Sequence, residues 1–472
     1  MTNPVAVALP TLRLSGSEED SVSWLRARLR RVAVQNTRKS HLYEGKLRAY
    51  DLGIAAPKGL PDLINAVCGW PGVVVDVLEE RLDFRGWTSI DDFGLMDVFR
   101  DNELGIDAAR GHLDGLIYGC GFVTVGTGDV GEPDVLVSVE STETCTTRWD
   151  YRLRRASSAL RQTRDERGVV VAETLYLPNE TIMFEVVRGA LSVVDRDHHG
   201  LGRVPVARLL NRDRASDRHG RSEITRSVEY LTAAAVRTLC GMEINREYYT
   251  SPKWTVLNAL PEVFGMDEDK SADENSRAGF SATQGRLNVV PPQVDENGDP
   301  VSPILHEFRP APPTPYIEQI KAYSQLLAAE SGIPAPYLGF VTDNPSSADA
   351  IRQQEYRLVK RAERRQASFG QAWLEVARLV LMMRGEFDQS TFRTVGVSWR
   401  DAATPTRAAA ADEAAKLIGA GVLPADSSVT WDRIGLTPLE QQQLAADRQR
   451  STVADLVQSL RAGNGSESVA PR

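Results

Sequence analysis

The chain has 472 residues, of which 42% are hydrophobic and 25% charged, and its formal net charge is −9. This length exceeds what one simple core accommodates, so we expect two to four domains. No run of 18 apolar residues occurs and no basic residue precedes the apolar segment at 5–9, so neither a membrane span nor a signal peptide is predicted. The acidic balance disfavours tight, general binding of DNA phosphates and so argues against a DNA-binding regulator.

The N-terminal part predicts a mixed helix and strand domain. Residues 1–20 are expected to form a mobile leader. The predicted helices cover residues 21–43, 60–82, 95–105 and 106–118, the second of them interrupted at Trp70-Pro71-Gly72. Alternating or β-branched residues predict strands at 121–125, 134–140, 169–177, 181–187 and 191–194. This part extends to residue 220.

Two helices that bracket an insertion come next. Residues 222–249 carry a helical stripe, with Ser222 as the expected N-cap. Residues 250–315 are rich in acidic residues and prolines and predict a small, loop-rich insertion. The second helix, at 316–331, ends at Gly332, a residue type that favours helix C-termini.

A proline-rich loop, Pro334–Pro345, then leads into a very long helix. Ser346 and Asp349 fit a capping box, and apolar periodicity continues to Gly385. About 38 residues would make a rod of roughly 57 Å. The apolar stripe of this helix exceeds what we expect one subunit to bury, so it predicts packing between subunits of a larger assembly. The stripe residues assigned to this packing are Phe369, Trp373 and Val376.

The C-terminal part predicts a strand at 391–399 that returns to the first domain. Ala- and Gln-rich helices are expected at 404–420 and 438–460, followed by a disordered tail at 461–472. The four cysteines are scattered without a C-x-x-C pair, which is typical of free thiols in a reducing compartment. They are Cys68, Cys120, Cys145 and Cys240.

Motifs for catalysis or cofactors are absent from the sequence. There is no P-loop, and Gly119-Cys120-Gly121 lacks the third glycine of a dinucleotide loop. Residues 195–199 (DRDHH) fit a solvated turn better than a metal site, because adjacent side chains diverge. We therefore predict no catalytic, cofactor or metal residues.

Two groups of residues leave alternatives open. Tyr248, Tyr249 and Trp254 fit packing of the insertion against a neighbour better than stacking on bases. Arginines one turn apart on the long helix could face phosphates, although a solvated face or ion pairs between subunits is the preferred interpretation. They are Arg357, Arg361 and Arg365.

Three segments resemble portal proteins of tailed bacteriophages, most closely those of long-tailed phages with Gram-positive or actinobacterial hosts. They read GIPxxYLG from Gly332, NPSSADAIRxxE from Asn344 and FGxxWxEVxRLxL from Phe369. Weaker matches at 43–45, 73–86 and 220–249 extend the resemblance over roughly residues 40–400 in a consistent order.

The resemblance implies the α+β portal fold: a mixed α/β wing, a two-helix stem, a small clip, a long spine helix and a helical crown. The implied parts are a wing at 1–220, a first stem helix at 221–249, a clip at 250–315, a second stem helix at 316–332, a tunnel loop at 333–346, a spine helix with a return strand at 347–400, and a crown with a disordered tail at 401–472.

The implied function is that of a non-enzymatic subunit of a twelve-membered ring at one capsid vertex. This ring would form the channel for genome packaging, retention and ejection, and a docking site for terminase and the head–tail connector. Its partners would be double-stranded DNA, terminase, major capsid and scaffold proteins and a head-completion adaptor, with no membrane. It would assemble in the host cytoplasm and end in the virion.

The tunnel loop is the strongest candidate site, because it is expected either to line the channel or to pack in the core. Its candidate residues are Tyr337, Phe340, Val341, Thr342, Asp343 and Asn344. The candidate clip surface for partners comprises Trp254, Phe264, Asp267 and Glu268. The rival functions are a minor capsid or scaffold-type virion protein without a channel, and a phage DNA-processing enzyme.

Overall fold

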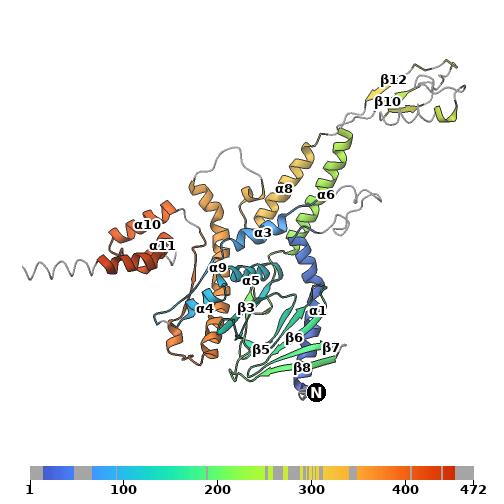
Figure 1. The fold of residues 1–472 in the computed structure, drawn as a ribbon. Coiled ribbons are helices and arrows are strands. Elements are labelled where there is room, and N and C mark those ends of the chain that lie inside the picture. The colour runs from blue at the N-terminus through green and yellow to red at the C-terminus, as the bar shows by residue number, and fades with distance from the viewer. Residues whose placement is uncertain are drawn as a thin grey trace, which may run out of the picture. The chain divides into compact units, whose positions relative to one another are not determined.

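The structure is a computed structural model of the whole chain. It describes residues 14–46, 66–91, 93–187, 190–249, 254–258, 269, 271–274, 287–290, 294, 297–299, 301–302, 304–307, 312–339, 348–403, 407–436 and 440–451. The chain divides into two compact units, residues 1–402 and 403–472. The first unit mixes helices and strands, as Figure 1 shows, which is the α+β class that the sequence predicts.

Helix α1, Gly16–Tyr43, begins at a capping box, Ser15 with Glu18, that was not predicted although the sequence contains its pattern. The Ser15 backbone N–H donates to Glu18, while the Ser15 hydroxyl accepts from the backbone of the first turn. The apolar side of α1, with Leu25 at its centre, packs against strands of the largest sheet through Leu160 and Phe184. Amphipathic periodicity therefore placed this helix correctly, and it begins before the predicted residue 21.

The largest sheet is a five-stranded antiparallel meander in the order β4-β5-β6-β7-β8. Its strands are β4 Cys145–Asp150, β5 Arg155–Arg164, β6 Val170–Tyr176, β7 Thr181–Val187 and β8 Ala190–Asp197. The last three confirm the predicted meander. Strands β4 and β5 were not predicted, because their polar and arginine-rich composition obscures the alternation of buried residues.

A second sheet, in the order β3-β2-β9, carries helix α5, Leu104–Tyr118, on one side. Its strands are β2 Cys120–Thr127, β3 Val135–Glu140 and β9 Val206–Leu210. Glycines allow α5 to approach closely: a Cβ on Gly121 would lie 2.7 Å from the carbonyl oxygen of Gly111. The glycines that interrupt this apolar part of the sequence therefore set the distance between helix and sheet.

Helix α9, Ala348–Met383, is the predicted long helix, and it packs on β9 and β2. After it, β13, Gly396–Trp399, pairs antiparallel with β1, Phe84–Thr88, which confirms the predicted return strand in part. Residues 391–394, also predicted as strand, form a 3-10 turn. The predicted capping residue Ser346 lies outside the described residues.

The assignment of Phe369, Trp373 and Val376 to ring packing is wrong. All three are fully buried within a single chain. Trp373 stacks on Phe84 at 4.5 Å between ring centroids, and Phe369 stacks on His112 at 5.1 Å. Residues that precede α9 by more than 230 positions contribute to the cover of its stripe, and sequence periodicity cannot show which part of the chain provides that cover.

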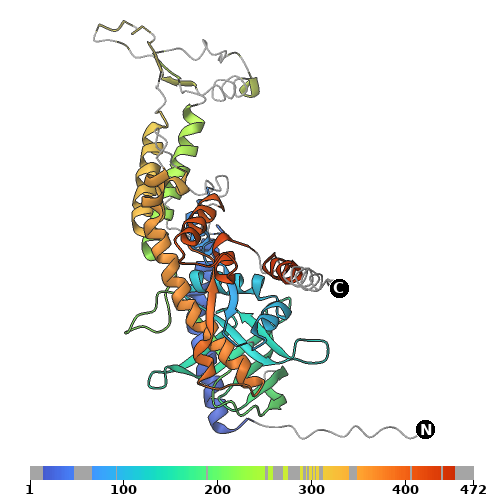
Figure 2. The ribbon, with the colours of Figure 1, turned by 90° about the vertical axis from the view of Figure 1, so that its left-hand side faces the viewer.

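Helices α6, Arg226–Tyr249, and α8, Thr314–Ser331, lie side by side in Figures 1 and 2. The predicted cap is wrong, because α6 starts after Thr225, whose hydroxyl accepts from the N–H of Val228, whereas Ser222 caps an earlier turn. Gly332 ends α8 in the left-handed region (φ 69°), as predicted. Between the two helices, β10 Trp254–Leu257, β11 Leu287–Val290 and β12 Ile304–Glu307 form a three-stranded sheet.

The remaining described helices complete both units. Helix α3, Trp70–Glu79, starts where an interruption was predicted, because Pro71 lies in its first turn and needs no hydrogen bond there. Helix α4 is Leu95–Asp101. The second unit contains α10, Arg407–Gly419, and α11, Ser428–Ile434, of which α11 was not predicted.

Candidate functional site

The predicted tunnel loop is described only at its start. Residues 335–338, which were predicted as part of a proline-rich loop, form a 3-10 turn. Leu338 is buried, whereas Tyr337 is exposed and its hydroxyl donates to Glu355 of α9, beside the guanidinium of Arg81. The turn is thus fastened to α9 and to the end of α3. The other candidate residues lie outside the described residues: Phe340, Val341, Thr342, Asp343 and Asn344.

The predicted clip surface is also largely outside the described part. Trp254 is the first residue of β10, paired in the backbone with Leu287 and Glu307. Phe264, Asp267 and Glu268 are not described. Their role as a surface for partners stays a prediction.

The segment at 195–199 does not form a metal site within the described structure. Strand β8 continues to Asp197, so the predicted turn begins later than expected. Arg196 lies between Glu18 and Glu180, at 2.9 and 2.7 Å. Among the residues that the structure describes, no three His, Cys, Asp or Glu side chains converge as ligands.

The arginine stripe of α9 is the feature that the structure organises most clearly. Arg361 and Arg365 bind Glu223, which lies just before α6 and is fully buried. Arg365 donates to one carboxylate oxygen at 2.7 and 3.2 Å, and Arg212 approaches the other oxygen at 3.5 Å. The preferred interpretation of this stripe, a solvated face or ion pairs between subunits, is therefore wrong for Arg361 and Arg365. Their partner belongs to the same chain.

The electrostatics of this cluster favour an ionised Glu223. Burial alone would raise the pKa of Glu223, but the attraction of Arg361 and Arg365 outweighs it, so the pKa is lower than usual. Burial also lowers the pKa of Arg361, although Glu223 opposes this effect. One carboxylate thus holds several guanidinium groups together in a region with little water.

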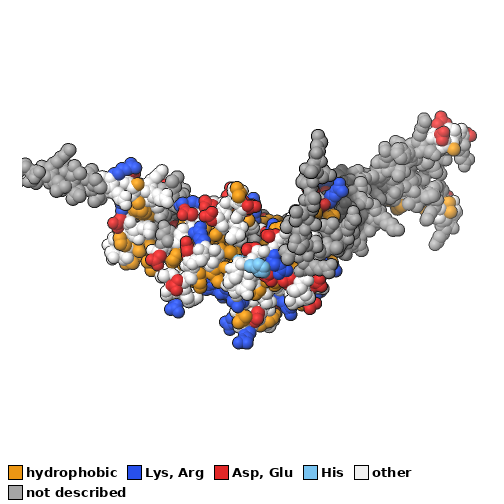
Figure 3. All heavy atoms as spheres, turned by 60° about the horizontal axis from the view of Figure 1, so that its bottom comes forward, with side chains coloured by type: hydrophobic (Ala, Val, Ile, Leu, Met, Phe, Trp, Pro, Cys, Tyr) orange, Lys and Arg blue, Asp and Glu red, His pale blue; other side chains and the backbone are white. Residues whose placement is uncertain are grey.

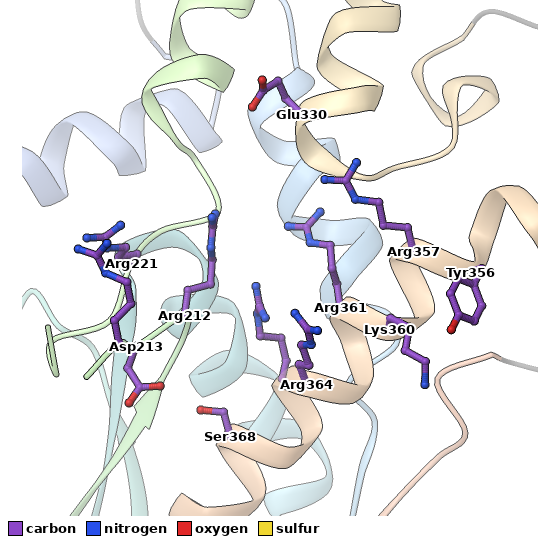
Figure 4. Close-up of a pocket in the computed structure, with 12 residues that line it drawn as sticks. Arg212, Asp213, Arg221, Glu330, Tyr356, Arg357, Lys360, Arg361, Arg364 and Ser368 are labelled. Atoms are coloured by element: carbon purple, nitrogen blue, oxygen red, sulfur yellow. The ribbon is translucent and has the colours of Figure 1, made fainter. Parts of the chain in front are cut away.

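An open pocket of about 660 Å³ lies above this cluster. Figure 4 shows its two walls: Arg212 and Arg221 come from the segment that follows β9, and Arg357 and Arg361 come from α9. Eight cationic side chains and two acidic ones line it. The cations are Arg212, Arg214, Arg221, Arg357, Lys360, Arg361, Arg364 and Arg365, and the carboxylates are Asp213 and Glu330.

A second pocket of about 450 Å³ adjoins the first, since Asp213 and Ser368 line both. It is also rich in arginine, with Glu375 as its second carboxylate. Its cations are Arg154, Arg155, Arg203, Arg208, Arg218 and Arg378. We call the two pockets together the arginine pockets. Figure 3 shows one face of the molecule, on which acidic and basic side chains are interspersed.

Sequence reasoning found only part of this site. The spacing of the arginines on α9 was visible, but Glu223 gave no signal, because a single glutamate beside a helix start is common. The arginines at 203–221 lie about 150 positions before α9, and only the fold brings them opposite it. Within the described residues, no helix has the length and apolar composition that crossing a bilayer requires.

Comparisons with known proteins identify the family. Residues 73–450 match the model of the family "Phage portal protein, SPP1 Gp6-like". The chain belongs to this family of phage portal proteins, as the sequence motifs indicated.

Individual relatives agree with this family. The chain is 34% identical over 406 residues to the portal protein of Mycobacterium phage D29, covering 83% of this chain and 81% of the relative. It is 33% identical over 397 residues to the portal protein of Mycobacterium phage L5, covering 81% and 79%.

Solved structures give more distant similarities. The chain matches a chain of a native gene transfer agent virion with 15% identity and a TM-score of 0.38, over 78% of this chain and 90% of that one. It matches a chain of the neck of a native gene transfer agent particle, computed with C12 symmetry, with 16% identity and the same TM-score and coverage.

Proposed function

We propose that this phage portal protein forms a ring of twelve subunits at one capsid vertex, and that double-stranded DNA passes through the ring. The observation that carries the proposal is the family match over residues 73–450. The order of elements supports it: a helix pair with a small sheet inserted between its members, then a short turn, then a helix of 36 residues. A scaffold-type virion protein or a DNA-processing enzyme accounts for neither observation.

We assign the parts of the chain accordingly. The five-stranded sheet and the β3-β2-β9 sheet, together with α1 and α5, would be the wing. Helices α6 and α8 would be the stem. The sheet of β10, β11 and β12 would belong to the clip, α9 would be the spine, and the unit at 403–472 would be the crown. These assignments follow the order of elements, and each can be tested by locating an inserted tag in an image of the particle.

The ring would have partners on both sides. We propose that the major capsid and scaffold proteins contact it during assembly, that terminase docks on it to pump DNA, and that a head-completion adaptor replaces terminase afterwards. Assembly would take place in the host cytoplasm. Contacts between subunits would come from exposed residues, because the stripe of α9 is already buried within one chain.

The test of the ring is imaging. We expect negative-stain micrographs of the protein, purified alone or with its scaffold and capsid proteins, to show rings with a central opening. Particles that stay monomeric in both preparations would contradict the proposal. Mass measurement in solution gives the subunit number independently of the images.

We propose that the tunnel loop extends into the channel beyond its first turn, from residue 340 to residue 345. Tyr337 and Glu355 fasten the start of this segment to α9, which would give a protruding loop a fixed base. Deletion of Phe340–Asp343 should leave assembly intact and impair DNA packaging or retention. Loss of a stable subunit would instead assign these residues to the core, because each large buried apolar side chain lost costs about 2–5 kcal/mol.

Charge reversal tests contact with DNA. Asp343→Lys would add a ring of cations and should slow DNA passage, more strongly at low salt, where screening is weak. Packaging that responds neither to the deletion nor to the reversal would show that this segment does not touch DNA.

A further inference from the structure

The arginine pockets carry more positive charge than their own carboxylates neutralise. When the acidic partners of the lining residues of the larger pocket are included, nine cations stand against five carboxylates. The added partners are Glu223, Asp217 and Glu363, with Arg218 as the partner of Asp213. Like charges held around one cavity repel each other, so the pocket gains stability when an anion enters.

Several of these cations have donors to spare. The side chains of Arg214 and Arg364 are exposed and make no ion pair with any residue that the structure describes. The Nη1 atom of Arg361 is buried and donates no hydrogen bond within the described residues. The same is true of Nε and Nη2 of Arg208 in the smaller pocket. Both pockets are thus lined by arginines whose hydrogen-bonding capacity is not used up within the described residues.

The arrangement favours a particular anion. Guanidinium groups bind oxyanions in forked, paired hydrogen bonds, and phosphate offers several oxygens to more than one fork. A single protein carboxylate would neutralise only one of the surplus charges. Because the two pockets adjoin, the excess of positive charge extends from Arg214 and Arg364 in the larger pocket to Arg155 and Arg378 in the smaller one. A row of anionic groups matches this extent better than one small ion.

We propose that the arginine pockets bind phosphate groups, and that the backbone of DNA supplies them. The exposed arginines at the rim would contact the phosphates, while Arg361 and Arg365 stay on Glu223 and hold the two walls together. The pockets lie within one subunit, so phosphate binding itself does not depend on ring formation. The choice of DNA as the source rests on the proposed function. In a chain of net charge −9, such a site would hold DNA locally where most of the surface repels it.

The test compares two variants with equal charge changes. Arg214→Ala with Arg364→Ala removes exposed cations of the larger pocket. Arg152→Ala with Arg167→Ala removes two exposed arginines of the hairpin turns that lie outside both pockets and make no ion pair with any described residue. Full-length protein is titrated with a short fluorescent DNA duplex at several salt concentrations and, separately, with pyrophosphate. Thermal unfolding checks that both variants fold.

The pocket variant should bind the duplex about tenfold more weakly at low salt, and its slope of log K against log salt should fall by about 1–2. In the control variant, both the duplex affinity and the salt slope should change less than in the pocket variant. Equal losses in both variants, or no loss in either, would overturn the proposal.

Two further outcomes separate the possible sources. Stoichiometric pyrophosphate binding that the pocket variant loses, with duplex affinity unchanged, would confirm phosphate as the ligand and overturn DNA as its source. A pocket variant that fails to self-associate but binds duplex and pyrophosphate normally would show that carboxylates of a second copy fill the pockets, against the proposal. If wild-type protein binds phosphate but forms no rings, this result would contradict only the proposed function.

Discussion

Glu223 occupies the most constrained position among the charged residues of the candidate site. It connects the segment before α6 to two successive turns of α9, and its side chain has no exposed surface. Its backbone N–H also donates to the carbonyl of Leu116 at the end of α5. A single residue therefore fixes three helices relative to one another. The arginine pockets depend on this geometry.

Glu223→Gln should destabilise the first unit by about 3 kcal/mol or more, because it leaves Arg361 and Arg365 buried without a counter-charge. Urea unfolding measures the loss. The matched control is Glu363→Gln, which breaks the exposed pair with Lys360 on the same helix and should leave the midpoint unchanged. Equal midpoints for the two variants would show that the buried cluster contributes nothing.

The buried His112 should make the folding stability of the protein depend on pH. Burial lowers its pKa to about 3, and its Nε2 accepts from the indole N–H of Trp373 at 2.9 Å. Because the unfolded chain binds this proton near pH 6.5 and the folded chain does not, folding stability should fall as pH drops from about 6.5 toward 3, by up to about 1.4 kcal/mol per pH unit.

His112→Gln keeps an acceptor for Trp373 but cannot titrate, so its stability should fall less steeply over the same pH range. Unfolding curves at a series of pH values check this difference. Parallel pH profiles for the variant and the wild type would mean that His112 is not held neutral.

At the scale of elements, the contact of α5 with its sheet depends on glycines. Gly121→Ala would bring a methyl group to 2.7 Å from the Gly111 carbonyl oxygen, and that backbone atom cannot move without shifting α5. We expect a loss of about 1–3 kcal/mol. Gly126→Ala, on the same strand, meets no atom within 4 Å and should be neutral or stabilising. Thermal unfolding of both variants would contradict the argument if Gly126→Ala were the more harmful.

The sequence predicted elements better than it predicted what covers them. Helices α1, α8 and α9 carried long periodic patterns, so the sequence predicted them, although α1 begins at Gly16, before its predicted start. Pro71 was misread because proline both interrupts helices and starts them, and the neighbouring residues do not distinguish the two cases. Trp373 was misjudged and Glu223 was overlooked for a common reason. Their partners, Phe84 and Arg361, lie more than 130 positions away, and local patterns contain no information about such pairings.

At the scale of the whole molecule, membership of the portal family predicts a protein that conducts DNA without performing chemistry on it. The purified protein should hydrolyse no ATP, because the sequence has no P-loop, and a terminase would supply the energy. His198→Ala with His199→Ala should leave DNA packaging unchanged. Phosphate release assays and packaging assays measure these outcomes. A stoichiometric metal that this double variant loses together with packaging would contradict the interpretation.

The pairing of β1 with β13 has a consequence for how the polypeptide is made. The ribosome completes β1 about 310 residues before it completes β13, so at about 5–20 residues per second the first strand waits roughly 15–60 s for its partner. During this time Phe84 and Trp87, which the finished protein buries against Trp373, have no cover from α9. The nascent chain therefore exposes apolar aromatic surface, which is prone to aggregation, throughout most of its synthesis. Host chaperones, rather than other virion proteins, would be the first to meet it.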